Sequence, residues 1–216
     1  MGRSKKTTQK PSQPGKPSNS LEKVRKLKQA GYKMVAFEVS DDLDPRYQYI
    51  EDEVAEATWL IKRGQLEKAR AAFESIIARE PRVKESYTNL GVIYTQLDQP
   101  ETAEALFLQA VEKFPGYAYP RANLAQIYLQ RGQVGKAEEI LTPGGKVLRK
   151  FSSAEFGFYF TIYSDILAEQ GNYKAALSWL KMLSQALPGG QGILRRRIGY
   201  SILGFIHRLI SKQTAP

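Results

Sequence analysis

Apolar residues between positions 84 and 115 form two successive runs, in each of which an apolar side chain recurs every three or four residues. The first run comprises Tyr87, Leu90, Ile93, Tyr94 and Leu97, and the second comprises Ala103, Leu106, Phe107 and Ala110. This spacing is typical of amphipathic helices. Asp98 lies between the runs, where a short polar residue tolerates turn dihedrals, and Pro115 follows the second run, where it ends a helix. The pattern predicts two helices joined by a tight turn.

The same pattern recurs along the chain at a fixed interval. Ala69, Ala103 and Ala137 are evenly spaced, and Ala176 follows Ala137 after an interval that is longer by five. Five residues are therefore inserted between the third and fourth copies. The insertion falls near residues 142–145 (Thr-Pro-Gly-Gly), which we expect to break or shorten the preceding helix. One helix pair cannot bury its own apolar face, so the copies are expected to stack on one another.

These copies resemble the tetratricopeptide repeat, which has a period of about 34 residues and the pattern of an aromatic residue, Leu-Gly, Tyr, Ala, a large apolar residue and Pro. Copy two matches nearly throughout, with Tyr87, Leu90, Gly91, Tyr94, Ala103, Phe107, Ala110 and Pro115. Copies three and four match in part, and copy one matches only in its second half. The resemblance covers roughly residues 50–188. It implies an all-α fold: an α-solenoid of about four helix-turn-helix repeats, wound as a right-handed superhelix with a concave face.

The prediction divides the chain into four parts. Residues 1–20 are expected to be a disordered basic tail, because they are polar and almost free of apolar residues. Residues 21–49 are expected to be a helical or irregular extension, in which residues 35–39 are a candidate to pack against the first repeat. Residues 50–190 are the solenoid, and residues 191–216 are a basic amphipathic helix. The four copies are expected at about residues 50–83, 84–117, 118–156 and 157–190.

The last of these helices has an apolar stripe at helical spacing: Leu194, Ile198, Ile202, Phe205 and Leu209, widened by Ile206 and Ile210. Arg197, Ser201, Gly204 and Arg208 lie opposite the stripe. Such a helix either caps the last repeat or lies on an anionic membrane surface. Capping is favoured, because the expected open face of Trp179, Leu180 and Leu183 needs a cover. His207, on the same helix, is expected to be an ordinary surface residue.

The formal net charge of +10 is unevenly distributed. Residues 1–33 hold ten Lys/Arg and one acid, residues 34–190 hold seventeen Lys/Arg and twenty-one acids, and residues 191–216 hold five Lys/Arg and no acid. The basic character therefore belongs to the two ends. A basic arm is compatible with binding to a membrane or a nucleic acid. A solubilising tail is the preferred interpretation, and nucleic-acid binding is the least favoured binding function.

Composition argues against catalysis. The chain has no cysteine and one histidine, His207, which disfavours thiolate metal sites and catalytic triads. Gly144-Gly145-Lys146 lacks the flanking residues of a phosphate-binding loop. We expect no enzyme activity, metal, cofactor or small-molecule substrate. No secretory signal or membrane span is recognised, so a cytoplasmic location is expected, with peripheral membrane contact as the alternative.

The resemblance implies that the first helix of each pair lines the concave surface and binds a protein or peptide. The positions expected to form this site are Glu51, Val54, Thr58, Glu85, Thr88, Val92, Thr95, Tyr119, Ala122, Gln126, Leu129, Phe158, Thr161, Asp165 and Glu169. Their charges are negative, which favours an apolar partner that carries some basic charge. Thr88 and Ala122 stand where a clamp for acidic chaperone tails would have Lys, so no such clamp is expected. The expected function is a protein-interaction scaffold or assembly factor, with a membrane-peripheral adaptor as the alternative.

Overall fold

The computed structural model of this chain describes residues 38–39, 50–142, 150–186 and 191–213, all of which belong to one compact unit. These residues form nine helices and two very short strands. In chain order the elements are β1 (Glu38–Val39), α2 (Glu51–Lys62), α3 (Leu66–Arg79), α4 (Lys84–Gln96), α5 (Pro100–Lys113), α6 (Ala118–Gln130), α7 (Val134–Leu141), β2 (Lys150–Phe151), α8 (Ser153–Glu169), α9 (Tyr173–Ala186) and α10 (Gln191–Gln213). The expectations for residues 1–20, and for most of residues 21–49, fall outside the described ranges.

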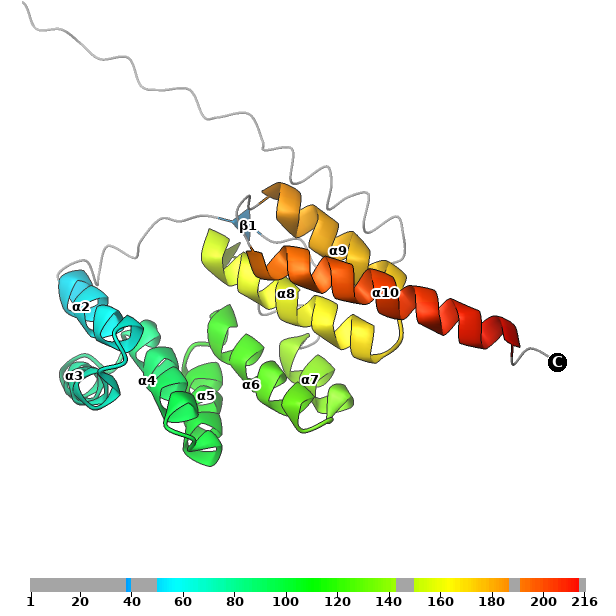
Figure 1. The fold of residues 1–216 in the computed structure, drawn as a ribbon. Helices are drawn as coiled ribbons and strands as arrows, with labels where there is room; N and C mark the ends of the chain where they lie inside the picture. The colour runs from blue at the N-terminus through cyan, green and yellow to red at the C-terminus, as the bar shows by residue number, and fades with distance from the viewer. Residues whose placement is uncertain (1–37, 40–49, 143–149, 187–190, 214–216) are drawn as a thin grey trace, which may run out of the picture. The chain divides into compact units, whose positions relative to one another are not determined.

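Successive helices pack as pairs, α2 with α3, α4 with α5, α6 with α7 and α8 with α9 (Figure 1). The turn inside each pair contains one residue with a left-handed backbone. These residues are Gly64, Asp98, Gly132 and Gly171, with φ angles of 70°, 58°, 70° and 77°. Glycine adopts this conformation without steric cost, and aspartate tolerates it better than most residues. The predicted α-solenoid of four helix pairs is confirmed.

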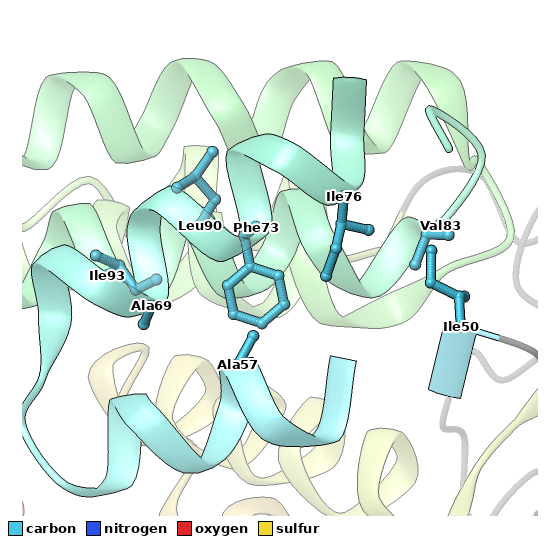
Figure 2. Close-up of a cluster of buried hydrophobic side chains, with 8 residues drawn as sticks. All are labelled: Ile50, Ala57, Ala69, Phe73, Ile76, Val83, Leu90 and Ile93. Atoms are coloured by element: carbon cyan, nitrogen blue, oxygen red, sulfur yellow. The ribbon is translucent and has the colours of Figure 1, made fainter. Parts of the chain in front are cut away.

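Small residues allow the paired helices to approach closely. The four repeating alanines, Ala69, Ala103, Ala137 and Ala176, are fully buried. Figure 2 shows the core of the first copy and its contact with the second, where Phe73 and Ile76 of α3 lie among Ala57 of α2 and Ile93 of α4. The recurrence of these alanines therefore reports a repeated core.

The stack is irregular where the five residues are inserted. Helix α7 has eight residues, whereas α3 and α5 have 14 each, so the predicted shortening is confirmed. A short α7 offers less surface, and α8 packs more extensively on α6 than on α7. In the first two copies, by contrast, α4 packs mainly on α3. The expected boundary between residues 156 and 157 is wrong, because it falls inside α8, which begins at a Ser152–Glu155 capping box.

The insertion also ends in a strand that the sequence pattern did not predict. Lys150 and Phe151 form β2, which pairs in parallel with Glu38 and Val39 of β1. β2 also contacts α8. Residues 38–39 therefore lie beside the start of the fourth copy, and the expectation that this segment packs against the first repeat is wrong for the two residues that the structure describes.

Helix α10 packs on α9, so its capping role is confirmed (Figure 1). Trp179, Leu180 and Leu183 of α9 are fully buried. The face that approaches α9 includes Gly204, where an added Cβ would lie 3.0 Å from Cβ of Tyr173. The apolar stripe on the opposite side of α10 is exposed. The implication that this stripe covers the last repeat is therefore wrong.

Candidate partner-binding surface

We term the first helices of the four pairs, α2, α4, α6 and α8, the A helices. They carry all fifteen expected site residues, and these residues define what we term the A-helix face. Three of these residues are exposed: Glu51, Thr95 and Glu169. Ten are half-buried: Val54, Thr58, Glu85, Val92, Tyr119, Gln126, Leu129, Phe158, Thr161 and Asp165. These thirteen side chains retain surface that another molecule can contact.

The remaining two residues are buried. Thr88 is 5% exposed and Ala122 is 0% exposed, because both lie inside the packing between neighbouring helices. The Thr88 hydroxyl donates to the Lys84 carbonyl at 3.4 Å within α4. Thr88 and Ala122 are therefore core residues. Their predicted place on the binding surface was wrong.

Two aromatic rings connect the third and fourth copies on the A-helix face. The Tyr119 ring of α6 lies 5.9 Å from the Phe158 ring of α8, measured between centroids, at an interplanar angle of 31°. Tyr117 packs edge-on against Tyr119 at 5.7 Å, which supports the pair from behind. Burial, with a further contribution from the Glu155 carboxylate, raises the pKa of Tyr119 to about 12. Its hydroxyl therefore stays protonated at neutral pH and can donate a hydrogen bond.

Threonine hydroxyls on this face donate to their own helices. Thr58 donates to the Val54 carbonyl at 2.7 Å, and Thr95 and Thr161 make the same i−4 bond to Gly91 and Gly157 at 3.0 and 2.7 Å. The hydroxyl oxygens of these residues retain acceptor capacity, and their methyl groups add apolar surface. The threonines thus extend the apolar contact that the aromatic pair provides.

Four carboxylates lie on the A-helix face. Glu51 and Glu169 are exposed, and half-buried Glu85 has the Lys84 ammonium 3.9 Å from its carboxylate. Asp165 accepts hydrogen bonds from Arg196 Nε at 2.8 Å and from the Tyr200 hydroxyl, both on α10. Burial, followed by this contact with Asp165, raises the pKa of Tyr200. Asp165 therefore attaches α10, and its expected role as a partner contact is not supported by this geometry.

The residues that hold Asp165 were missed at the sequence level. The sequence pattern assigned the polar side of the C-terminal helix to Arg197, Ser201, Gly204 and Arg208, and it singled out neither Arg196 nor Tyr200. Their four-residue spacing places them on one helix face, but a partner on a helix two elements earlier in the chain cannot be identified from spacing alone.

We predict that Asp165→Ala loosens α10. The substitution leaves the half-buried Arg196 guanidinium without its carboxylate, at an expected cost of about 1–2 kcal/mol after allowance for solvent screening. Amide hydrogen exchange should become several-fold faster in α10 and remain unchanged in α2–α5. Glu169→Ala, an exposed acid on the same helix, is the control. Unchanged protection of α10 in Asp165→Ala would show that this contact does not hold the helix.

Metal ligands do not gather anywhere in the described part of the chain. No group of three or more His, Asp or Glu side chains there is arranged to hold an ion. Among the same residues, no helix combines the length and apolar character needed to cross a bilayer.

Comparison with known sequences identifies the repeat. Two family profiles, both described as tetratricopeptide repeat, match residues 54–118 and 98–152. Human tetratricopeptide repeat protein 8 is 33% identical over 76 residues, which is 35% of this chain and 14% of that protein. The mouse protein of the same name matches over 15% of its length. The matching region is thus a small part of these relatives.

Solved structures share the fold. A thermophilic tetratricopeptide-repeat protein of Thermus thermophilus superposes with a TM-score of 0.58 over 72% of this chain and 82% of that chain, at 19% identity. A monomeric mutant of IFIT1 solved with m7Gppp-AAAA superposes with a TM-score of 0.61 over 91% of this chain and 42% of that chain, also at 19% identity. These matches show that residues 54–152 are built of tetratricopeptide repeats, which agrees with the helix pairs joined by left-handed turn residues.

Proposed function

We propose that this chain is a non-catalytic scaffold that binds a polypeptide on its A-helix face, with Tyr119 and Phe158 as the central anchor. The observation that carries the proposal is this half-buried ring pair, contributed by two successive A helices. Aromatic residues supply large contact areas at low entropic cost and are enriched among the residues that dominate binding energy. Half-buried Leu129 and Val92 add further apolar surface on α6 and α4.

Charge on this face supports a partner with basic residues. None of the fifteen expected site positions is Lys or Arg, and Glu51 and Glu169 are exposed. Complementary charge raises the association rate and disfavours acidic competitors. We therefore propose an apolar peptide segment flanked by Lys or Arg as the occupant. A role in assembly and a cytoplasmic location accompany this proposal, and nucleic-acid binding through residues 1–33 concerns residues outside the described part.

The proposal is tested with peptides selected from a random display library on the immobilised full-length chain. We expect the enriched peptides to combine apolar residues with Lys or Arg. Tyr119→Ala with Phe158→Ala should weaken their binding by roughly tenfold to a hundredfold, because two anchor rings are lost. Fluorescence anisotropy of a labelled peptide measures the affinity. Tyr128→Ala is the matched control, because Tyr128 is also on α6 but directs its hydroxyl to Glu104 of α5 at 3.0 Å.

A second pair of variants tests the charge of the partner. Glu51→Lys with Glu169→Lys should weaken binding of the basic peptides, and the loss should shrink at high salt. Glu112→Lys with Glu139→Lys gives the same change in net charge at exposed positions of the second helices, α5 and α7. Equal affinities for these two double variants would contradict a basic partner. Unchanged affinity after loss of both rings would contradict the site itself.

A further inference from the structure

Helix α10 exposes a continuous apolar stripe made of Leu194, Ile198, Ile202, Phe205 and Ile206, which we term the α10 stripe. Ile198 is 56% exposed and Phe205 is 57% exposed. Six of the eight large apolar side chains that are exposed in the described part of the chain lie on α10; the other two, Trp59 and Leu108, lie on separate helices. Isolated exposed apolar residues are ordinary, whereas a contiguous patch marks a surface that contacts something else.

The stripe is exposed because α10 is attached to the repeats through its opposite side. Arg196 and Tyr200 bind Asp165, and Arg197 Nη1 donates to the Ser184 hydroxyl at 3.4 Å. Gly204 lies against Tyr173. These contacts hold the helix with the α10 stripe directed away from α9. The cap is therefore complete without the stripe.

Charge selects the occupant of the stripe. Residues 191–216 contain five Lys/Arg and no acid. A second copy of α10 seated on the stripe would add its own exposed Arg195 to a surface that already carries this cation. Residues 1–33 of this chain, with ten Lys/Arg and one acid, would be repelled in the same way. An occupant with negative charge is favoured over both, because like charges in contact are destabilising.

The polar groups of α10 favour a lipid surface over an acidic protein. Ser201, at the edge of the stripe, donates its hydroxyl to the Arg197 carbonyl of its own helix at 2.8 Å. The five members of the stripe are hydrocarbon side chains with no hydrogen-bonding group, so they provide nothing that would fix the register of a partner helix. The boundary between the headgroups and the acyl chains of a bilayer requires no such groups. Amphipathic helices with a basic polar side and aliphatic and Phe residues on the other side lie in the plane of anionic membranes.

We infer that α10 docks the protein on an anionic bilayer, with the α10 stripe at the acyl boundary and Arg195 among the headgroups. Arg195 is exposed beside the stripe. The helix has 23 residues but does not qualify as a membrane span, so it lies on the surface. This docking is independent of peptide binding on the A-helix face, because it uses other residues. The protein would thereby hold a polypeptide partner at a membrane surface.

The first test is co-sedimentation of the full-length protein with vesicles of phosphatidylcholine and phosphatidylserine mixed two to one. We expect binding that weakens as salt is raised and that is much lower on pure phosphatidylcholine. Ile202→Glu with Phe205→Glu should lower the partition coefficient about a hundredfold, because two apolar side chains no longer enter the boundary. Trp59→Glu with Leu108→Glu makes the same change in charge at the two exposed apolar residues outside α10 and should bind like the wild type.

The second test locates the contact. Because the chain has no cysteine, Ile198→Cys provides a unique site for an environment-sensitive fluorophore. The emission of the label at position 198 should shift to the blue on anionic vesicles, whereas a label on Leu108→Cys should not respond. Sedimentation velocity of the wild type, with and without vesicles, reports self-association in parallel.

The possible outcomes of these tests distinguish docking of the α10 stripe on a membrane from the alternatives. Vesicle binding that survives Ile202→Glu with Phe205→Glu would assign the attraction to the basic arm and overturn the inference. Dimerisation that is lost in the same variant, without vesicle binding, would assign the stripe to a second copy and also overturn it. The absence of a blue shift at position 198 on either kind of vesicle would do the same. The α10 variants leave the A-helix face intact, so peptide affinity should stay unchanged in them. A failure of membrane docking is therefore distinguishable from a failure of the proposed scaffold function.

Discussion

Trp179→Ala is expected to lower the free energy of unfolding of the fourth copy by about 3–5 kcal/mol, the usual cost of removing a large buried aromatic side chain. Trp179 is fully buried on α9. Its ring stacks on Phe160 of α8 at 4.6 Å between centroids, with an interplanar angle of 9°, and lies edge-on to Tyr163 at 5.8 Å. The substitution leaves a cavity among rigid rings that cannot collapse into it.

The loss should remain local, because repeats contact mainly their neighbours. The fourth copy and α10 should unfold at lower urea concentration, while α2–α5 keep their midpoint. The chain has two tryptophans, Trp59 in the first copy and Trp179 in the fourth. Fluorescence of Trp59 in Trp179→Ala therefore reports the first copy, and circular dichroism reports the whole chain.

Trp59→Ala is the control for this prediction. Trp59 is 51% exposed, with the Arg63 guanidinium 4.4 Å from its ring centroid. Its removal should cost less than about 1 kcal/mol, because little buried contact is lost. A single transition with an equal midpoint for both variants would contradict the role of Trp179 as the core of the fourth copy.

Gly91→Ala is expected to destabilise the second copy by about 1–2 kcal/mol, although alanine is the better helix former. A Cβ at position 91 of α4 would lie 2.4 Å from Cε1 and 2.7 Å from Cζ of Phe107 on α5. Phe107 is buried in a cluster with Leu124 and Ile127, so its ring has no space to move into. Overpacking of this kind costs about 1–3 kcal/mol, which exceeds the helix-propensity gain of up to about 1 kcal/mol.

Gly135→Ala provides the matched control. Gly135 lies in α7, and a Cβ there would meet nothing within 4 Å. The same substitution should therefore stabilise the chain by about 0.5–1 kcal/mol, with the opposite sign. Phe107→Leu in the Gly91→Ala background should restore part of the loss, and the double-mutant cycle measures the coupling. Stabilisation by Gly91→Ala would contradict the close approach of α4 and α5.

The first copy shows why the residue types alone do not predict this effect. Ala57 and Phe73 occupy the positions equivalent to Gly91 and Phe107, and both are buried. An alanine opposite a phenylalanine is thus accommodated between α2 and α3. Glycine is required at position 91 because of where the Phe107 ring lies, which is a property of the packed structure.

Sequence periodicity predicted the helix pairs and the turn at Asp98, and it singled out the four recurring alanines that the structure buries. It also predicted the shortening of α7, because Pro143 and two glycines follow its last turn. Each of these features depends on side chains within one or two turns of a helix. The candidate surface was predicted less completely. Thr88 and Ala122 lie on the same sides of their helices as Thr95 and Gln126, and only the neighbouring helix determines that the first two are buried.

The sequence by itself determined that this chain is a stack of helix pairs, since the recurring apolar stripes, turn residues and alanines are satisfied only when each pair covers the next. Only the tertiary structure decided which side of α10 faces the repeats. The apolar stripe predicted burial, but Asp165, Arg196 and Gly204 attach the opposite side and leave the stripe exposed. The pairing of β1 with β2 was equally inaccessible, because it joins residues far apart in the chain. Such contacts depend on distances between elements, which a local pattern does not contain.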